Sequence, residues 1–419
     1  MTSGKHLKAR IRTRMARTGE RYSTARRHVV GAAEPAPSDH GWALRGGTHP
    51  DSANIANVLA HAGVSNLSEA MVLGIGGGLG AGYILWEFKQ HRYTNLTLGY
   101  RYRWNYIDWT ARTLDRLGAT AHVHATSGAK GAAGELTARL EAGQPAIVWP
   151  DRQLIGYWHL PPHLDGFGGH PVVVYAATGD AMRVDDRNLA PLTVERSTLD
   201  RARGRVSSYK NNLVAVEAVT VPADLAPLVR AGIADCVAHL GAPSASFAVP
   251  AWGKWARLVT DTRNAKGWPR VFADGRGLTD ALLSIWEGIE PVGMSGGHLR
   301  DLYADFLDEA APLVGDTAAA ASAFREAGRR WHDLAEAALP ADVPEYQRLR
   351  ELTADLAAGV AAGDEGAEAR ATAAGELWTL RADLYEKPPA DTDFAALGTC
   401  LSTVYEAERD AVDALREVL

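Results

Sequence analysis

The pattern of hydrophobic residues changes near Val221, and this change constrains the fold more than any other feature of the sequence. Before it, short runs rich in β-branched residues alternate with helical patterns, which predicts mixed α and β structure. After it, the chain is rich in Ala, Leu, Arg and Glu with helical periodicity. We therefore predict a basic arm and linker over residues 1–40, an α+β domain over 41–220 and a helical domain over 221–419.

Two of the predicted strands form a hairpin that places a histidine beside an aspartate. His170 opens a strand that runs to residue 176, and Asp186 follows a second strand over 182–185. A carboxylate can hold one imidazole nitrogen and leave the other to accept a proton, as a general base requires. The alternative is a purely structural His–Asp bond. Because strand side chains alternate between faces, Asp185 and Asp186 cannot both face His170, and two strands of equal length favour Asp186.

A helix is predicted to begin at Asp51 or Ser52, directly after a proline. Backbone amides and the helix dipole stabilise an anion at such a position, so these two residues are candidates for the chemistry of the site. Asp and Ser are also common N-caps, which needs no catalytic explanation.

A glycine-rich segment over residues 74–82 follows a short predicted helix. It resembles a dinucleotide-binding turn only weakly, because Tyr100 and Arg101 stand where an acidic residue is expected. We instead predict a turn that brings backbone close to a substrate channel.

No metal site and no cofactor are predicted. His122 and His124 share one strand face, and His159 and His163 flank two prolines, but no cysteine or His-Glu-x-x-His spacing supports zinc. The two cysteines are far apart and no secretory or membrane-spanning segment is recognisable, so a cytoplasmic protein without disulfides is expected.

Charge is unevenly distributed along the chain. Residues 1–30 contain nine Lys or Arg residues and one Glu, whereas the whole chain carries a net charge of -6. Such an arm could bind nucleic acid, an acidic carrier protein or the acidic remainder of the chain, and the alternative is a solvated, partly helical leader. Nucleic acid is a disfavoured partner, because no second basic patch and few aromatic residues accompany the arm.

Three ordered segments resemble the butirosin biosynthesis protein H family. They are residues 49–63 with 67–83, residues 169–175 with Asp186, and residues 289–311. The resemblance covers roughly residues 40–419 and implies a papain-like (cysteine-peptidase-like) N-terminal domain followed by a helical C-terminal domain. It also implies acyl transfer from a carrier-protein thioester to an amine, with a cysteine nucleophile completed by histidine and aspartate.

His170 and Asp186 match the base and its orienting carboxylate in this resemblance. Pro50 occupies the position of the nucleophile, and proline has neither a thiol nor a free amide. The substrate is expected near Asp51, with five further residues as binding candidates: His49, Gly76, Gly77, Gly78 and Tyr83.

Three interpretations remain open. In the one we favour, the chain is an acyltransferase-like or cyclase-like enzyme of natural-product biosynthesis, in which His170 deprotonates an acceptor amine that attacks the thioester directly. In the second, Ser52 or Asp51 replaces the cysteine, although a shift of two residues turns a helical side chain by about 200°. In the third, catalysis is lost and the chain is a scaffold for a carrier protein or an intermediate. The predicted partners are an acyl or peptidyl carrier protein and a small-molecule or peptidyl amine; no membrane is expected, and a homodimer is allowed.

Overall fold

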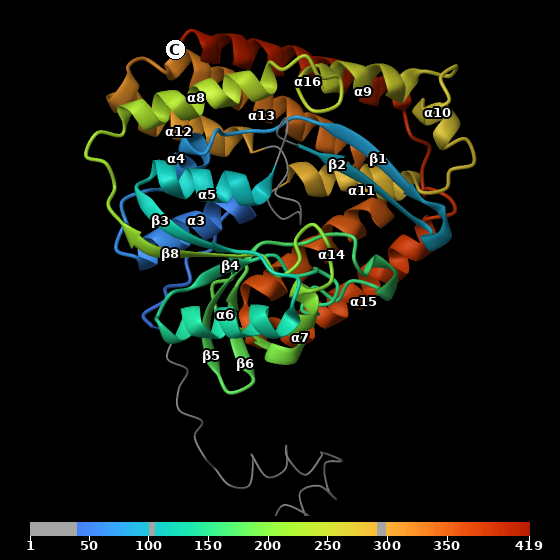
Figure 1. Cartoon of the computed structure of the whole chain (residues 1–419). Coiled ribbons are helices and arrows are strands. Elements are labelled where there is room, and N and C mark those ends of the chain that lie inside the picture. Colours follow the sequence, from blue (N-terminus) through green and yellow to red (C-terminus); the bar gives the residue numbers. More distant parts are fainter. Residues whose placement is uncertain (1–39, 100–104, 291–298) are drawn as a thin grey trace, which may run out of the picture.

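The computed structural model describes residues 40–99, 105–290 and 299–419 (Figure 1). The predictions for the basic arm and for most of the linker lie outside the described residues. The sequence also predicts a strand and its exit over residues 96–103, and the end of that segment lies outside the described residues too.

The centre of the first half is a six-stranded sheet in which every neighbouring pair is antiparallel. The strands, in spatial order, are β3 (Ala119–His124), β8 (Leu213–Val219), β4 (Ala146–Val148), β5 (Val172–Thr178), β6 (Ala181–Asp185) and β7 (Leu192–Glu195). Residues 172–176 of β5 are all buried, so both faces of the sheet are covered at its centre. This arrangement explains why β5 is a continuous apolar run and not an alternating one.

Helices from the same half pack around this sheet. They are α3 (Pro50–His61), α4 (Glu69–Ile75), α5 (Tyr106–Arg116), α6 (Ala129–Glu141) and α7 (Arg196–Arg203). Helices α3 and α6 both contact β5. The sequence alone predicts a helix over residues 135–141. This start is too late, because glycines at 131 and 134 conceal a buried stripe that begins at Ala132. Strand β7 and helix α7 were not predicted.

A separate hairpin, β1 (Tyr83–Phe88) and β2 (Tyr93–Leu98), joins the two halves of the molecule (Figure 1). The short 3-10 helix η1 (Lys89–His91) forms its turn. Helix α11 (Leu278–Ile289) packs against β2, and α9 (Pro250–Thr260) packs against β1. The sequence indicated only the second of these strands, and it placed that strand's start at Leu96 instead of Tyr93.

All elements after residue 225 are helices, as the periodicity predicted, within the part of the chain that the structure describes. Besides α9 and α11 they are α8 (Ala226–Leu240), α10 (Trp268–Val271), α12 (Arg300–Val314), α13 (Ala318–Ala338), α14 (Pro344–Ala361), η3 (Gly363–Gly366), α15 (Ala367–Leu384) and α16 (Phe394–Arg416). Helix α4 of the first half contacts α8 and α12, so the two halves share one core. The domain boundary at residue 220 therefore stays a prediction.

A buried ion pair connects helices α12 and α16, and a tryptophan of α13 bonds to it. The Arg300 guanidinium donates to both Glu408 carboxylate oxygens, at 2.5 and 2.8 Å, and the Trp331 indole donates to the same carboxylate at 2.6 Å. None of the described helices combines the length and the apolar character needed to cross a bilayer.

Candidate functional site

The hairpin of β5 and β6 brings His170 and Asp186 into contact. His170 lies two residues before β5, Asp186 comes directly after β6, and the strand register pairs Val173 with Asp185. The distance from His170 Nε2 to Asp186 Oδ1 is 2.7 Å. The neighbouring Asp185 carboxylate turns to the other side, where it accepts a hydrogen bond from the Trp42 indole at 3.1 Å.

Asp186 is held by several donors besides the histidine. Its Oδ2 accepts hydrogen bonds from the Tyr157 hydroxyl and the Trp158 indole, both at 2.9 Å. Burial alone would raise the pKa of this carboxyl, but His170 and the nearby Arg187 lower it well below its usual range. The carboxylate is therefore ionised at neutral pH and fixed in orientation.

The imidazole of His170 is neutral at neutral pH. Burial lowers the pKa of its imidazole below the ordinary value of 6.5, although Asp186 acts in the opposite direction. With Nε2 held by the carboxylate, Nδ1 is the nitrogen left to accept a proton. No described residue forms a hydrogen bond with Nδ1.

A cavity of about 720 Å³ opens beside His170. This volume lies within the range of about 300–1,000 Å³ that is typical of small-molecule sites. Both halves of the chain contribute to its wall. From the first half come His49, Pro50, Asp51, Trp86, Phe88, Tyr93, Asn95, Thr97, Tyr106, Trp149, Arg152, Leu160, Leu164, residues 166–171 and Tyr209; from the second come Glu287, Trp378 and Arg381.

The start of helix α3 reaches this cavity through His49, Pro50 and Asp51. The N-cap is His49 and not Asp51 or Ser52, because the ring nitrogen Nδ1 of His49 accepts from the Ser52 amide and Pro50 occupies the first helical position. The Asp51 carboxylate lies 3.8 Å from His49 Nε2. The position expected to carry the nucleophile therefore faces the same space as His170.

Ser52, a candidate replacement nucleophile, does not line the cavity. Its side chain is fully buried, and its hydroxyl donates to the Glu69 carboxylate at 3.2 Å. The physical reason is the helical rotation of about 200° between positions 50 and 52.

The predicted substrate-binding glycines lie elsewhere, which corrects the expectation of a channel turn. Gly76, Gly77 and Gly78 end helix α4 and pack against other helices. A Cβ at Gly76 would lie 2.6 Å from the Trp109 ring, and one at Gly78 would clash with Tyr303. Gly77 and Gly78 also have left-handed φ angles of +96° and +62°, which residues with a Cβ rarely adopt. These glycines allow close packing and turning of the chain.

Tyr83 is also outside the cavity, which corrects its predicted role. Its hydroxyl accepts a hydrogen bond from the Trp268 indole at 2.9 Å, and its ring stacks on Trp255 at a centroid distance of 5.0 Å. It is a core residue that joins β1 to the helical half.

Sequence reasoning missed the charged part of the cavity wall. Arg152 lies over the Trp158 ring at 4.4 Å, and its Nε and Nη2 are inaccessible to solvent without forming a hydrogen bond to any described residue. Arg381 pairs with Asp280 at 3.0 Å and approaches Glu287 to 3.8 Å. The sequence offers no local signal that Arg152, Glu287 and Arg381 share one wall, since they come from segments far apart in the chain.

The fold and site define a mixed α/β protein with a histidine–carboxylate pair at a cavity. The family model described as butirosin biosynthesis protein H, N-terminal, matches residues 49–187, and a domain of unknown function (DUF4872) matches residues 197–362. These two matches agree with the resemblance to the butirosin biosynthesis protein H family that the sequence predicted. A comparison with curated proteins found no match.

Proposed function

We propose that this chain transfers an acyl or peptidyl group from a carrier-protein thioester to an amine in natural-product biosynthesis, with His170 as general base. One observation carries the proposal: the His170–Asp186 pair opens onto the cavity that Pro50 also lines. The match to the butirosin biosynthesis protein H N-terminal model supports the biosynthetic context. The resemblance to papain-like domains, with histidine and carboxylate facing the start of a helix, supports the acyl-transfer chemistry.

The proposed reaction needs no acyl-enzyme. The amine nitrogen attacks the thioester carbonyl carbon while His170 Nδ1 accepts the amine proton. The carbon–sulfur bond then breaks, and the departing sulfur takes the proton from the imidazolium. The products are an amide and a thiol, and His170 returns to its neutral form.

Arg152 suits the charge that develops during this reaction. In the tetrahedral intermediate the thioester oxygen carries a negative charge, which a fixed cation in a dry site stabilises. Arg152 lines the same cavity as His170, and its guanidinium is held over the Trp158 ring at 4.4 Å. The Asp51 carboxylate lines the same cavity and would orient the incoming amine.

Pro50 supports the direct route over a covalent one. It has no side-chain nucleophile at the position where the family resemblance implies cysteine. The same residue also favours the rival function, a non-catalytic scaffold that binds a carrier protein or an intermediate. The two functions differ in whether a thioester and an amine that bind beside His170 react with each other there.

Cysteine at position 50 gives a test of the site that needs no knowledge of the natural substrate. In Pro50→Cys, the His170 imidazole should stabilise a thiolate, so we expect iodoacetamide to alkylate the introduced thiol rapidly below pH 7. A small acyl thioester of N-acetylcysteamine should also leave an acyl adduct on that thiol, visible by intact mass. The unmodified chain should form no adduct.

Ser52→Cys is the matched control, because residue 52 faces Glu69 and not the cavity. It should react no faster than the native cysteines, and His170→Ala in the Pro50→Cys background should abolish the low-pH reactivity. Equal reactivity at positions 50 and 52 would contradict the proposed site, and an adduct on the unmodified chain would contradict the direct route.

A further inference from the structure

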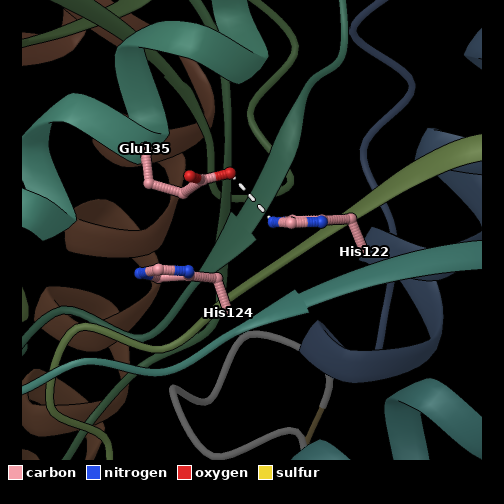
Figure 2. Close-up of side chains that lie close together, drawn as sticks. All are labelled: His122, His124 and Glu135. Carbon is pink, nitrogen blue, oxygen red and sulfur yellow. Dashed lines mark ion pairs between the residues drawn. The ribbon is translucent and has the colours of Figure 1, made fainter.

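A second cluster of chemically competent side chains lies on the edge strand β3, apart from the cavity. His122 and His124 are two positions apart, so both side chains project from one face, and Glu135 faces them from helix α6 (Figure 2). One ligand atom from each of the three residues lies within 4.8 Å of the other two. None of the three lines the cavity described above.

The ligand atoms are buried but lack aligned hydrogen-bond partners. His122 Nε2, His124 Nε2 and Glu135 Oε1 are all inaccessible to solvent, and none makes a hydrogen bond to a described residue. His122 Nε2 and Glu135 Oε1 lie 2.8 Å apart as an ion pair, drawn dashed in Figure 2. His124 Nε2 has neither a hydrogen bond nor an ion pair to a described residue, which is uncommon for a buried polar atom, and a cation bound by all three atoms would satisfy it.

The surroundings supply the groups that usually support metal ligands. Glu217 of β8 lies 3.7 Å from His122 Nδ1, the ring nitrogen that a metal on Nε2 would leave protonated. Arg139 Nε lies 3.1 Å from Glu135 Oε1. Metal-bound histidines commonly donate their second nitrogen to a carboxylate, and bound carboxylates are themselves hydrogen-bonded.

We propose that His122, His124 and Glu135 bind a zinc ion or a similar divalent transition metal. Two imidazoles and one carboxylate form a donor set that zinc accepts, with a fourth position open to water or to another ligand. The ion would connect the edge strand β3 to helix α6, which the His122–Glu135 ion pair already joins. The spacing of the histidines alone did not indicate this site, because the third ligand comes from a different element.

Metal binding by the tag-free full-length chain tests the proposal. After removal of metals with a chelator, the protein should bind one equivalent of Zn²⁺ at this site in a titration, and Co²⁺ should give the visible absorption of a tetrahedral centre. Glu135→Gln and His124→Ala should each weaken binding by more than about 100-fold, because loss of a direct ligand exceeds the roughly 10- to 100-fold cost of losing a supporting group.

Glu141→Gln is the matched control on the same helix, since Glu141 is exposed and outside the cluster. It should bind Zn²⁺ as the unmodified chain does. Circular dichroism identifies any variant that fails to fold, and Glu135→Gln, which preserves side-chain volume, tests the site if His124→Ala is lost. Absence of binding to the unmodified chain, or unchanged binding in Glu135→Gln, would mean that the cluster is only an imidazole–carboxylate ion pair.

Discussion

Replacing His170 by alanine should lower the rate of amide formation by about 10²- to 10⁴-fold, the usual contribution of a general base. In the proposed reaction Nδ1 accepts the proton, because the Asp186 carboxylate holds the proton of His170 on Nε2 and burial keeps the imidazole neutral. The measurement is turnover of a carrier-bound acyl thioester with an amine acceptor. His170→Gln, which keeps a polar side chain without a base, should show the same loss.

The pH profile separates this effect from a loss of folding. Because burial lowers the pKa of His170 below 6.5, the unmodified chain should keep its activity at pH 6.5 and lose it only as the pH falls through the lowered value. The alanine variant should lack this dependence. His61 of α3 lies outside the cavity and bonds to the Gly143 carbonyl, so His61→Ala should retain activity. Unchanged turnover in His170→Ala would end the base hypothesis.

The same shift affects stability with a defined sign. Between the lowered pKa and 6.5, the unfolded chain binds more protons at this histidine than the folded chain does. The contribution of His170 to the free energy of unfolding is therefore fully present above pH 6.5 and decreases as the pH falls.

Replacing Asp186 by asparagine should cost nearly as much activity as removing His170, about 10²- to 10⁴-fold. Asparagine can present an amide N–H to His170 Nε2, which would move the imidazole proton to Nδ1 and remove the acceptor. It also leaves the Tyr157 and Trp158 donors with a weaker partner, at about 1–3 kcal/mol of stability. Turnover and thermal unfolding measure the two effects separately.

Asp185→Asn is the matched control for this variant. Asp185 is equally buried one residue away, but it bonds to Trp42 and Asn57 and not to His170. Burial raises its pKa to about 7, so asparagine imitates a form it already adopts near neutrality. This variant should keep the pH profile of the unmodified chain. If both variants lost activity equally, Asp186 would have only a structural role.

Local sequence signals predicted the parts of the site that lie close together in the chain. The hairpin register alone places Asp186 beside His170, because sixteen residues of strand, turn and strand fix that distance. The helix beginning near residue 50 was predicted for the same reason, although proline at the first helical position transferred the cap to His49. The predicted substrate-channel turn at the glycine-rich segment was wrong. Glycines are favoured both in turns and where helices pack closely, so the composition did not distinguish the two.

The sequence by itself determined the change from mixed structure to helices, the histidine–aspartate hairpin and the absence of a nucleophile at Pro50. Only the tertiary structure decided that Glu287, Trp378 and Arg381 complete the cavity, that Ser52 turns away from it, and that Glu135 meets His122 and His124. The periodic signals that mark strands and helices extend over a few turns of chain. Contacts between distant segments depend on how whole elements pack, and no short pattern encodes that packing.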